Sequence, residues 1–246
     1  MSKTDKREDY LKAIESRKSR RSYTKEPIDP EKVWFLKQCM EEINGESGLS
    51  IRWLEDGGAA FSMTKSYGMF KNVRSVMVLQ GQRKASDLRE RAGYYGERLV
   101  LEAARLGLGT CWVAGTYDKS SALLPVIDGE EIVCLISVGN VPPEQTLKEK
   151  VIYRSVHRSS LKPEDFYIAD GPVPDWFMNG IKAVQKAPSA INSQKVRFQY
   201  KNQTATVTIP ETRPTDLIDL GIAKLHFTIG AEGNFPFGNG AVFEKE

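Results

Sequence analysis

Basic residues near the N-terminus are the first groups in this chain that could do chemistry. Residues 17–21 read Arg-Lys-Ser-Arg-Arg, so guanidinium groups, an ammonium group and a hydroxyl fall within five positions. A guanidinium group presents parallel N–H donors that match the oxygens of a phosphate, and a hydroxyl adds one more donor. This segment therefore indicates an anion site. The alternative is a solvated N-terminal helix, which is the commoner meaning of a basic run.

Other reactive side chains are sparse. The cysteines (Cys39, Cys111 and Cys134) are widely spaced and the histidines number only two, a pattern that indicates neither a disulfide framework nor a zinc site. The net charge of +3, from 35 basic and 32 acidic residues, is too small to predict nucleic-acid binding. A charged N-terminus and the lack of a long apolar run predict a cytoplasmic protein that contacts no membrane.

The elements that must position these residues follow from apolar periodicity. Helices are expected over residues 8–18, from Pro30 to Asn44-Gly45, over 94–106, 118–124 and 216–229, and from Pro174 to before Pro188. Strands are expected over 51–54, 75–79 and 132–138, with a hairpin over 196–200 and 205–209. Residues 55–72 and 141–162 are expected to be irregular. This content of helices and strands predicts a globular protein of the α/β (α+β) class, with mixed central sheets flanked by helices.

A shift of 145 positions aligns two segments without gaps. Residues 28–37 then meet 173–182, and residues 51–53 meet 196–198. Identities are few, so the match depends on apolar positions and on the order of elements. It predicts two pseudo-symmetric, unequal halves, residues 1–155 and 156–246, that pair as a pseudo-dimer. A monomer is compatible with such a chain.

Three motifs resemble those of the nitroreductase family, whose members bind FMN. AIESRKSRRSY (residues 13–23) is similar to the R-x-S-x-R phosphate motif of the family, and APSAINSQ (residues 187–194) is similar to its P-S-x-x-N-x-Q loop. LEAARLGLGTCWVAG (residues 101–115) looks like its helix and the following loop at the flavin edge. In the usual family the P-S-x-x-N loop follows the phosphate motif closely, whereas here it lies about 170 residues after that motif. The chain therefore resembles the subfamily in which two subunits have become one polypeptide.

This resemblance implies a nitroreductase-like fold with one FMN site per chain. Arg17 and Ser19 would hold the phosphate of FMN. Arg21 would lie nearer the ribityl chain or the pyrimidine edge, and Arg158 would add a second phosphate contact.

The resemblance also implies which residues meet the flavin ring. The second half would line the ring with residues that let the backbone approach closely, namely Pro188, Ser189, Ala190 and Asn192. The residues along the reactive edge of the ring would be Trp112, Val113, Ala114 and Gly115. A backbone N–H of Val113 or Ala114 would meet the flavin nitrogen that takes the hydride. No metal and no catalytic side chain are implied. A plain turn at Pro188-Ser189 and a core role for Trp112 are the alternatives.

The implied reaction is ping-pong hydride transfer. Reduced nicotinamide, NADH or NADPH, would stack on FMN and leave, and a small-molecule electron acceptor would then bind in the same place. A nitroaromatic, a quinone or another conjugated compound could be that acceptor. One alternative is a flavin-binding sensor without turnover, and another is a relic of the fold that binds no flavin.

Overall fold

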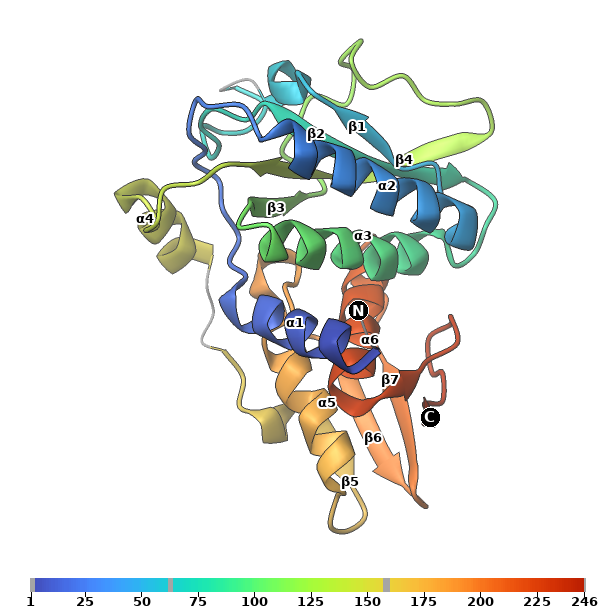
Figure 1. Cartoon of the computed structure of the whole chain (residues 1–246). Helices are drawn as coiled ribbons and strands as arrows, with labels where there is room; N and C mark the ends of the chain where they lie inside the picture. Colours follow the sequence, from blue (N-terminus) through green and yellow to red (C-terminus); the bar gives the residue numbers. More distant parts are fainter. Residues whose placement is uncertain (1–2, 62–63, 157–159, 246) are drawn as a thin grey trace. The chain divides into compact units, whose positions relative to one another are not determined.

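The computed structural model of this chain describes residues 3–61, 64–156 and 160–245. These residues form a mixed α+β architecture of helices and small sheets, as the sequence predicts (Figure 1). Two compact units can be distinguished and are described one at a time. The first unit comprises residues 17–88 and 99–155, and the second comprises residues 1–16, 89–98 and 156–246. None of the helices described is long and apolar enough to span a membrane.

A four-stranded antiparallel sheet is the centre of the first unit. Its strands follow the order β1-β2-β4-β3, with bounds β1 (Arg52–Leu54), β2 (Ser75–Gln82), β3 (Gly109–Val113) and β4 (Glu130–Gly139) (Figure 1). Most of β2 and the second half of β4 are buried, which is why both read as nearly continuous apolar runs in the sequence. The strands predicted at residues 51–54, 75–79 and 132–138 are therefore confirmed.

Two helices end at residues other than those predicted. Helix α1 (Lys3–Ser16) ends before Arg17, because residue 19 pairs with Thr110 instead. Helix α2 (Pro30–Ser47) begins at Pro30 as predicted but continues past Asn44-Gly45. It ends at Gly48, whose φ of 66° supplies the left-handed cap that glycine favours.

Four further segments correct the prediction. Residues 118–124 form turns instead of a helix, because the Asp118 carboxylate accepts hydrogen bonds from the Ser120 N–H and hydroxyl. Helix α4 (Leu147–Val156) lies in the stretch expected to be irregular. Helix α3 (Leu88–Arg105) starts before residue 94, and a short 3-10 helix (Gly57–Phe61) interrupts the loop expected over 55–72.

The second unit packs helices against a three-stranded sheet. The helices are α5 (Asp175–Gln185) and α6 (Asp216–Ala231), and the sheet has the order β5-β6-β7, with β5 (Tyr167–Ala169), β6 (Arg197–Lys201) and β7 (Thr204–Thr208). A two-stranded pair, β8 (Gly233–Asn234) and β9 (Glu244–Lys245), lies near the C-terminus. The core contains Phe177, Phe198 and Phe227. Gly180 allows α5 to approach α6, since a Cβ there would lie 2.7 Å from the Phe227 ring.

The two segments aligned by the shift of 145 positions have the same order of elements. Residues 28–37 contain the start of α2 and residues 173–182 the start of α5, while residues 51–53 overlap β1 and residues 196–198 overlap β6. Each strand then pairs with the next strand in an antiparallel manner, and a helix follows. The order therefore agrees with the alignment, and an origin by duplication stays a prediction.

Candidate functional site

Residues 17–23, which we call the arm, follow α1 and lie beside strand β3 (Figure 1). Ser19 forms a parallel bridge with Thr110, and the Arg20 N–H donates to the Thr110 carbonyl at 2.8 Å. Farther along, the Lys71 N–H donates to the Arg21 carbonyl at 2.9 Å. These bonds to two different segments fix the path of the arm.

From Ser19 to Ser22 the side chains alternate between a partly exposed and a buried environment, while Lys18 before them is exposed and Tyr23 after them is buried. Arg20 and Ser22 are buried, whereas Ser19 and Arg21 are partly exposed, as is Arg17. This alternation is typical of extended backbone, in which every second side chain points to the same side. The three residues of the R-x-S-x-R motif therefore share one side of the arm.

Gly109 allows the arm to approach β3 closely. A Cβ at this position would lie 2.3 Å from Val141 Cγ1 and 3.0 Å from Arg20 Cβ, so any side chain would push the two apart. The sequence predicts Gly107 and Gly109 as the end of a helix. Only Gly107, with φ of 75°, has that role, while Gly109 is the first residue of β3.

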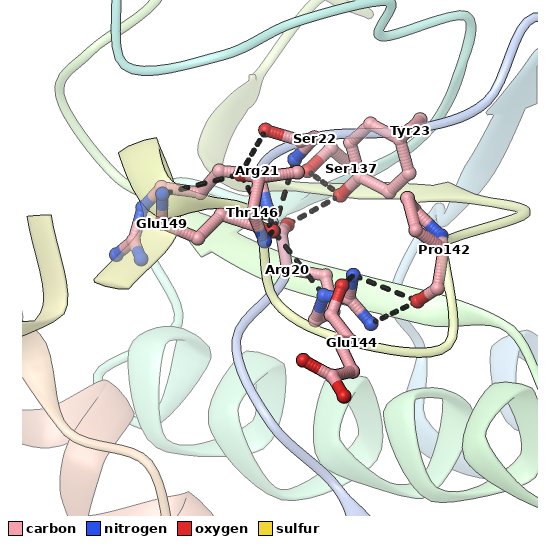
Figure 2. A network of polar contacts seen from close by, with 9 residues as sticks. All are labelled: Arg20, Arg21, Ser22, Tyr23, Ser137, Pro142, Glu144, Thr146 and Glu149. Carbon is pink, nitrogen blue, oxygen red and sulfur yellow. Dashed lines mark hydrogen bonds and ion pairs between the residues drawn. The ribbon is translucent and has the colours of Figure 1, made fainter. Parts of the chain in front are cut away.

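The buried side of the arm is held by the carboxylate of Glu149 on α4 (Figure 2). Glu149 Oε1 accepts the N–H of Arg21 at 2.7 Å, the N–H of Ser22 at 3.1 Å and the Nε–H of Arg20 at 3.2 Å. Glu149 Oε2 accepts the N–H and the hydroxyl of Thr146 at 2.8 and 3.1 Å. Burial favours a higher pKa for Glu149, but the hydrogen bonds outweigh it and hold the pKa below its ordinary value.

Arg20 has a structural role in the arm. Its guanidinium group donates to the Pro142 carbonyl at 3.0 Å and to the Glu144 carbonyl at 3.1 Å, besides its ion pair with Glu149 (Figure 2). Sequence reasoning missed Glu149 and its partner Thr146. The signal was present, because Thr-x-x-Glu is the pattern of a capping box, and Glu149 N–H does donate to Thr146 Oγ1 at 3.2 Å.

The charges of the arm act on strand β3. Burial raises the pKa of the Cys111 thiol, and the positive charges of Arg21 and Arg17 oppose this rise. Both arginines therefore influence the same position at the start of β3, beside Ser19 and Thr110. A guanidinium group and a hydroxyl, as on Arg17 and Ser19, form a donor set suited to a phosphate.

The residues predicted at the flavin edge continue from the same strand. Trp112 and Val113 end β3, and Ala114 and Gly115 follow it. The predicted loop is thus a strand as far as Val113, which pairs with Leu135. A rise of about 3.3 Å per residue puts Val113 roughly 10 Å from Thr110. A five-carbon ribityl chain can cover that distance, so the contact of both segments with one FMN stays a prediction that this spacing allows.

The P-S-x-x-N loop belongs to the second unit and has an unusual backbone. Ala190–Asn192 is a 3-10 turn, and left-handed φ values of 49°, 51° and 48° occur at Ile191, Asn192 and Gln194. Such a conformation costs a residue with a Cβ about 1–2 kcal/mol, so the surrounding structure must hold it. Pro188, Ser189, Ala190 and Asn192 are all partly exposed.

The carboxylate of Asp219 on α6 holds this loop. It accepts the Ala190 N–H at 3.0 and 3.1 Å and the Ser193 hydroxyl at 3.3 Å, and it is 4% exposed. Burial raises the pKa of Asp219 to about 7, although the hydrogen bond from Ala190 lowers it. The contact of this loop with FMN stays a prediction from its motif, and the predicted phosphate ligand Arg158 lies outside the described residues.

Replacing Ile191 by asparagine should stabilise the protein by about 1 kcal/mol. Asparagine tolerates the left-handed region, and Ile191 is half-exposed, so little apolar burial is lost. Chemical denaturation of the wild type and of Ile191→Asn measures the difference. Ile168→Asn, at an exposed position in β5, should show no such gain. An unchanged or lower stability of Ile191→Asn would contradict the strain inferred here.

Comparison with known proteins agrees with this architecture. The family model described as “Putative TM nitroreductase” matches residues 9–231. No curated protein matches the chain. A solved structure described as a “putative nitroreductase” from Thermotoga maritima is 18% identical with a TM-score of 0.60, covering 95% of this chain and 91% of that chain. At this identity the similarity shows the fold alone.

Shorter solved structures match part of the chain. An FMN-dependent nitroreductase from Clostridium difficile is 17% identical with a TM-score of 0.44, covering 61% of this chain and 99% of that chain. A structure described as a “putative nitroreductase in complex with fmn” from Desulfovibrio desulfuricans is 18% identical with a TM-score of 0.43, covering 57% of this chain and 94% of that chain. The match of the family model over most of the sequence is decisive: the chain belongs to the “Putative TM nitroreductase” family.

Proposed function

We propose that this protein is an FMN-dependent oxidoreductase whose arm binds the phosphate of the flavin. The arm is the observation that carries the proposal, because Arg17, Ser19 and Arg21 share one side of it next to β3. The contacts of Glu149 with Arg20 and with the backbone of Arg21 and Ser22 hold the arm in place, which supports a role in binding. Membership of the nitroreductase family supports the same cofactor.

Each remaining residue then has a proposed role. A positive charge on Arg21 near the ring would favour the anionic, reduced form of the flavin. The backbone of Val113 and Ala114 would meet the reactive edge, with Trp112 and Gly115 beside it. Arg158 and the P-S-x-x-N loop enter the proposal from their motifs alone.

The proposed reaction is the transfer of reducing equivalents from NADH or NADPH to a small conjugated acceptor, such as a nitroaromatic or a quinone. Bound FMN supplies the hydride chemistry. The protein contributes binding, orientation and shielding, and we assign no side chain as a nucleophile or general base. Among the described residues, no cluster of histidine, cysteine, aspartate and glutamate could hold a metal ion.

Rapid mixing under anaerobic conditions tests this function. The protein loaded with FMN is mixed with NADH or NADPH while the visible absorption of the flavin is followed, and p-nitrobenzoate or a benzoquinone is then added. Rapid loss of the absorption and its return on adding the acceptor are the expected results. A protein that binds FMN firmly but is reduced by neither nucleotide would instead be the flavin-binding sensor, the rival interpretation.

A further inference from the structure

We infer that Glu149 is a positioning residue for the flavin phosphate, an inference that rests on the proposed binding of FMN. Its carboxylate is the point where the arm and the start of α4 meet, since it accepts hydrogen bonds from the arm and from Thr146 (Figure 2). Only 1% of the side chain is exposed. Glu149 therefore acts on the ligand through the backbone of the arm.

Two of these bonds determine the direction of Arg21. One oxygen, Oε1, accepts the N–H of Arg21 and the N–H of the next residue, Ser22, which fixes the peptide groups on both sides of the Arg21 Cα atom. The carbonyl of Arg21 also accepts a hydrogen bond from the backbone N–H of Lys71. The side of the arm from which the Arg21 side chain extends is set by these contacts. Fixing this direction in advance reduces the ordering cost of binding.

Glu149 also compensates the charge of Arg20. The ion pair is buried, with the Arg20 side chain 9% exposed, and the guanidinium group has further contacts with two carbonyls. Without the carboxylate, Arg20 would be a buried cation without its counter-charge, and the arm would have to rearrange to hydrate it. The loss would reach Arg17 and Ser19 through the backbone that they share with Arg20.

This role predicts a selective effect, because Arg17 and Ser19 of the arm would meet the phosphate, whereas Arg21 would meet a part of the ligand that riboflavin keeps. Riboflavin has the same ring and ribityl chain as FMN but no phosphate. Disturbing the arm should therefore weaken the binding of FMN more than that of riboflavin. A general loss of stability would instead affect both flavins to the same degree.

Glu149→Gln is the test, with Glu130→Gln as the matched control. Glu130 is another buried carboxylate of the first unit, on β4, and it accepts hydrogen bonds from Ser50 at 2.8 Å and Gln80 at 2.7 Å. Dissociation constants for FMN and riboflavin are measured by quenching of flavin fluorescence in the apoprotein. We expect Glu149→Gln to weaken FMN binding about tenfold to hundredfold. Riboflavin binding should weaken less than FMN binding, and Glu130→Gln should keep the wild-type ratio of the two constants.

The outcomes separate this inference from the proposed function. A Glu149→Gln protein with the wild-type preference for FMN over riboflavin would overturn the positioning role. A wild-type protein that binds neither flavin would contradict the proposed function itself. If Glu149→Gln does not fold, Thr146→Val replaces it, because this variant removes one hydroxyl donor to Glu149 and keeps the side-chain shape. A preference reduced about threefold would then support the inference, and an unchanged preference would overturn it.

Discussion

Replacing Arg17 and Arg21 together by alanine should weaken FMN binding by about a hundredfold to ten-thousandfold. Hydrogen bonds from a charged group each contribute about 1.5–3 kcal/mol, so Arg17 at the phosphate and Arg21 at the ribityl chain or pyrimidine edge together contribute about 3–6 kcal/mol. Each 1.4 kcal/mol changes the dissociation constant about tenfold. Fluorescence titration of the apoprotein with FMN measures the loss. High salt should also weaken the wild-type interaction, since it screens exposed charges.

Lys18→Ala is the matched control for the arginine variants. Lys18 lies on the same arm between Arg17 and Ser19, carries the same charge and is exposed. In extended backbone its side chain points away from the side that the motif shares. It should therefore change the affinity less than about threefold. Full FMN occupancy in the double arginine variant would show that the phosphate is bound elsewhere.

Replacing Asp219 by asparagine should remove a decrease in stability that the wild type undergoes between about pH 4 and pH 7. The pKa of Asp219 is about 7 in the folded protein, against 3.8 ordinarily. Between these values the folded state keeps a proton that the unfolded state has lost. The free energy of unfolding must then fall as the pH rises, and it levels off above pH 7. A shift of about 3 pH units corresponds to at most about 4 kcal/mol.

The neighbours of Asp219 do not produce this slope. Asp216 pairs with Lys195 at 2.9 Å, and although burial opposes it, this bond and those from Thr212 and Arg213 lower the pKa of Asp216. Its contribution is therefore complete above its ordinary pKa and declines only in stronger acid. Of these two carboxylates, only Asp219 lowers the free energy of unfolding between pH 5 and pH 7.

Urea denaturation at pH 5, 6, 7 and 8 measures the effect. The asparagine carboxamide keeps an oxygen that can accept the Ala190 N–H, so the loop can remain in place. Asp219→Asn should gain stability relative to the wild type at each step up to pH 7. Asp170→Asn, at an exposed position of the same unit, should run parallel to the wild type. If the free energy of unfolding of Asp219→Asn also ran parallel to that of the wild type across this pH range, the raised pKa of Asp219 would be contradicted.

Much of the fold follows from local sequence signals. The buried strands β2 and β4 are long apolar runs, and Pro30 marks the start of α2. The hairpin of β6 and β7 is turned by Asn202 and Gln203, both with positive φ. In each case the signal lies within the element itself, so periodicity and turn residues are sufficient.

The parts that the sequence did not predict depend on partners distant in the chain. The arm leaves the helical pattern at Arg17 because its hydrogen-bonding partners are Thr110 and Lys71. Helix α4 was missed because its first turn is organised around Glu149, which bonds the arm more than 100 residues away. The left-handed Ile191 has no local signal, since its loop is held by Asp219 on α6. For the candidate site, the R-x-S-x-R residues could be predicted, and the network behind them could not.

The arm is expected to bind one FMN per chain. A shift of 145 positions aligns the three motif residues of the arm with Lys162, Glu164 and Phe166, which do not repeat the motif. The most direct measurement is the visible absorption spectrum of the purified protein after incubation with FMN and removal of free flavin, followed by release and counting of FMN. We predict a yellow protein with one FMN per chain. A colourless protein, or one that holds two FMN per chain, would contradict the account.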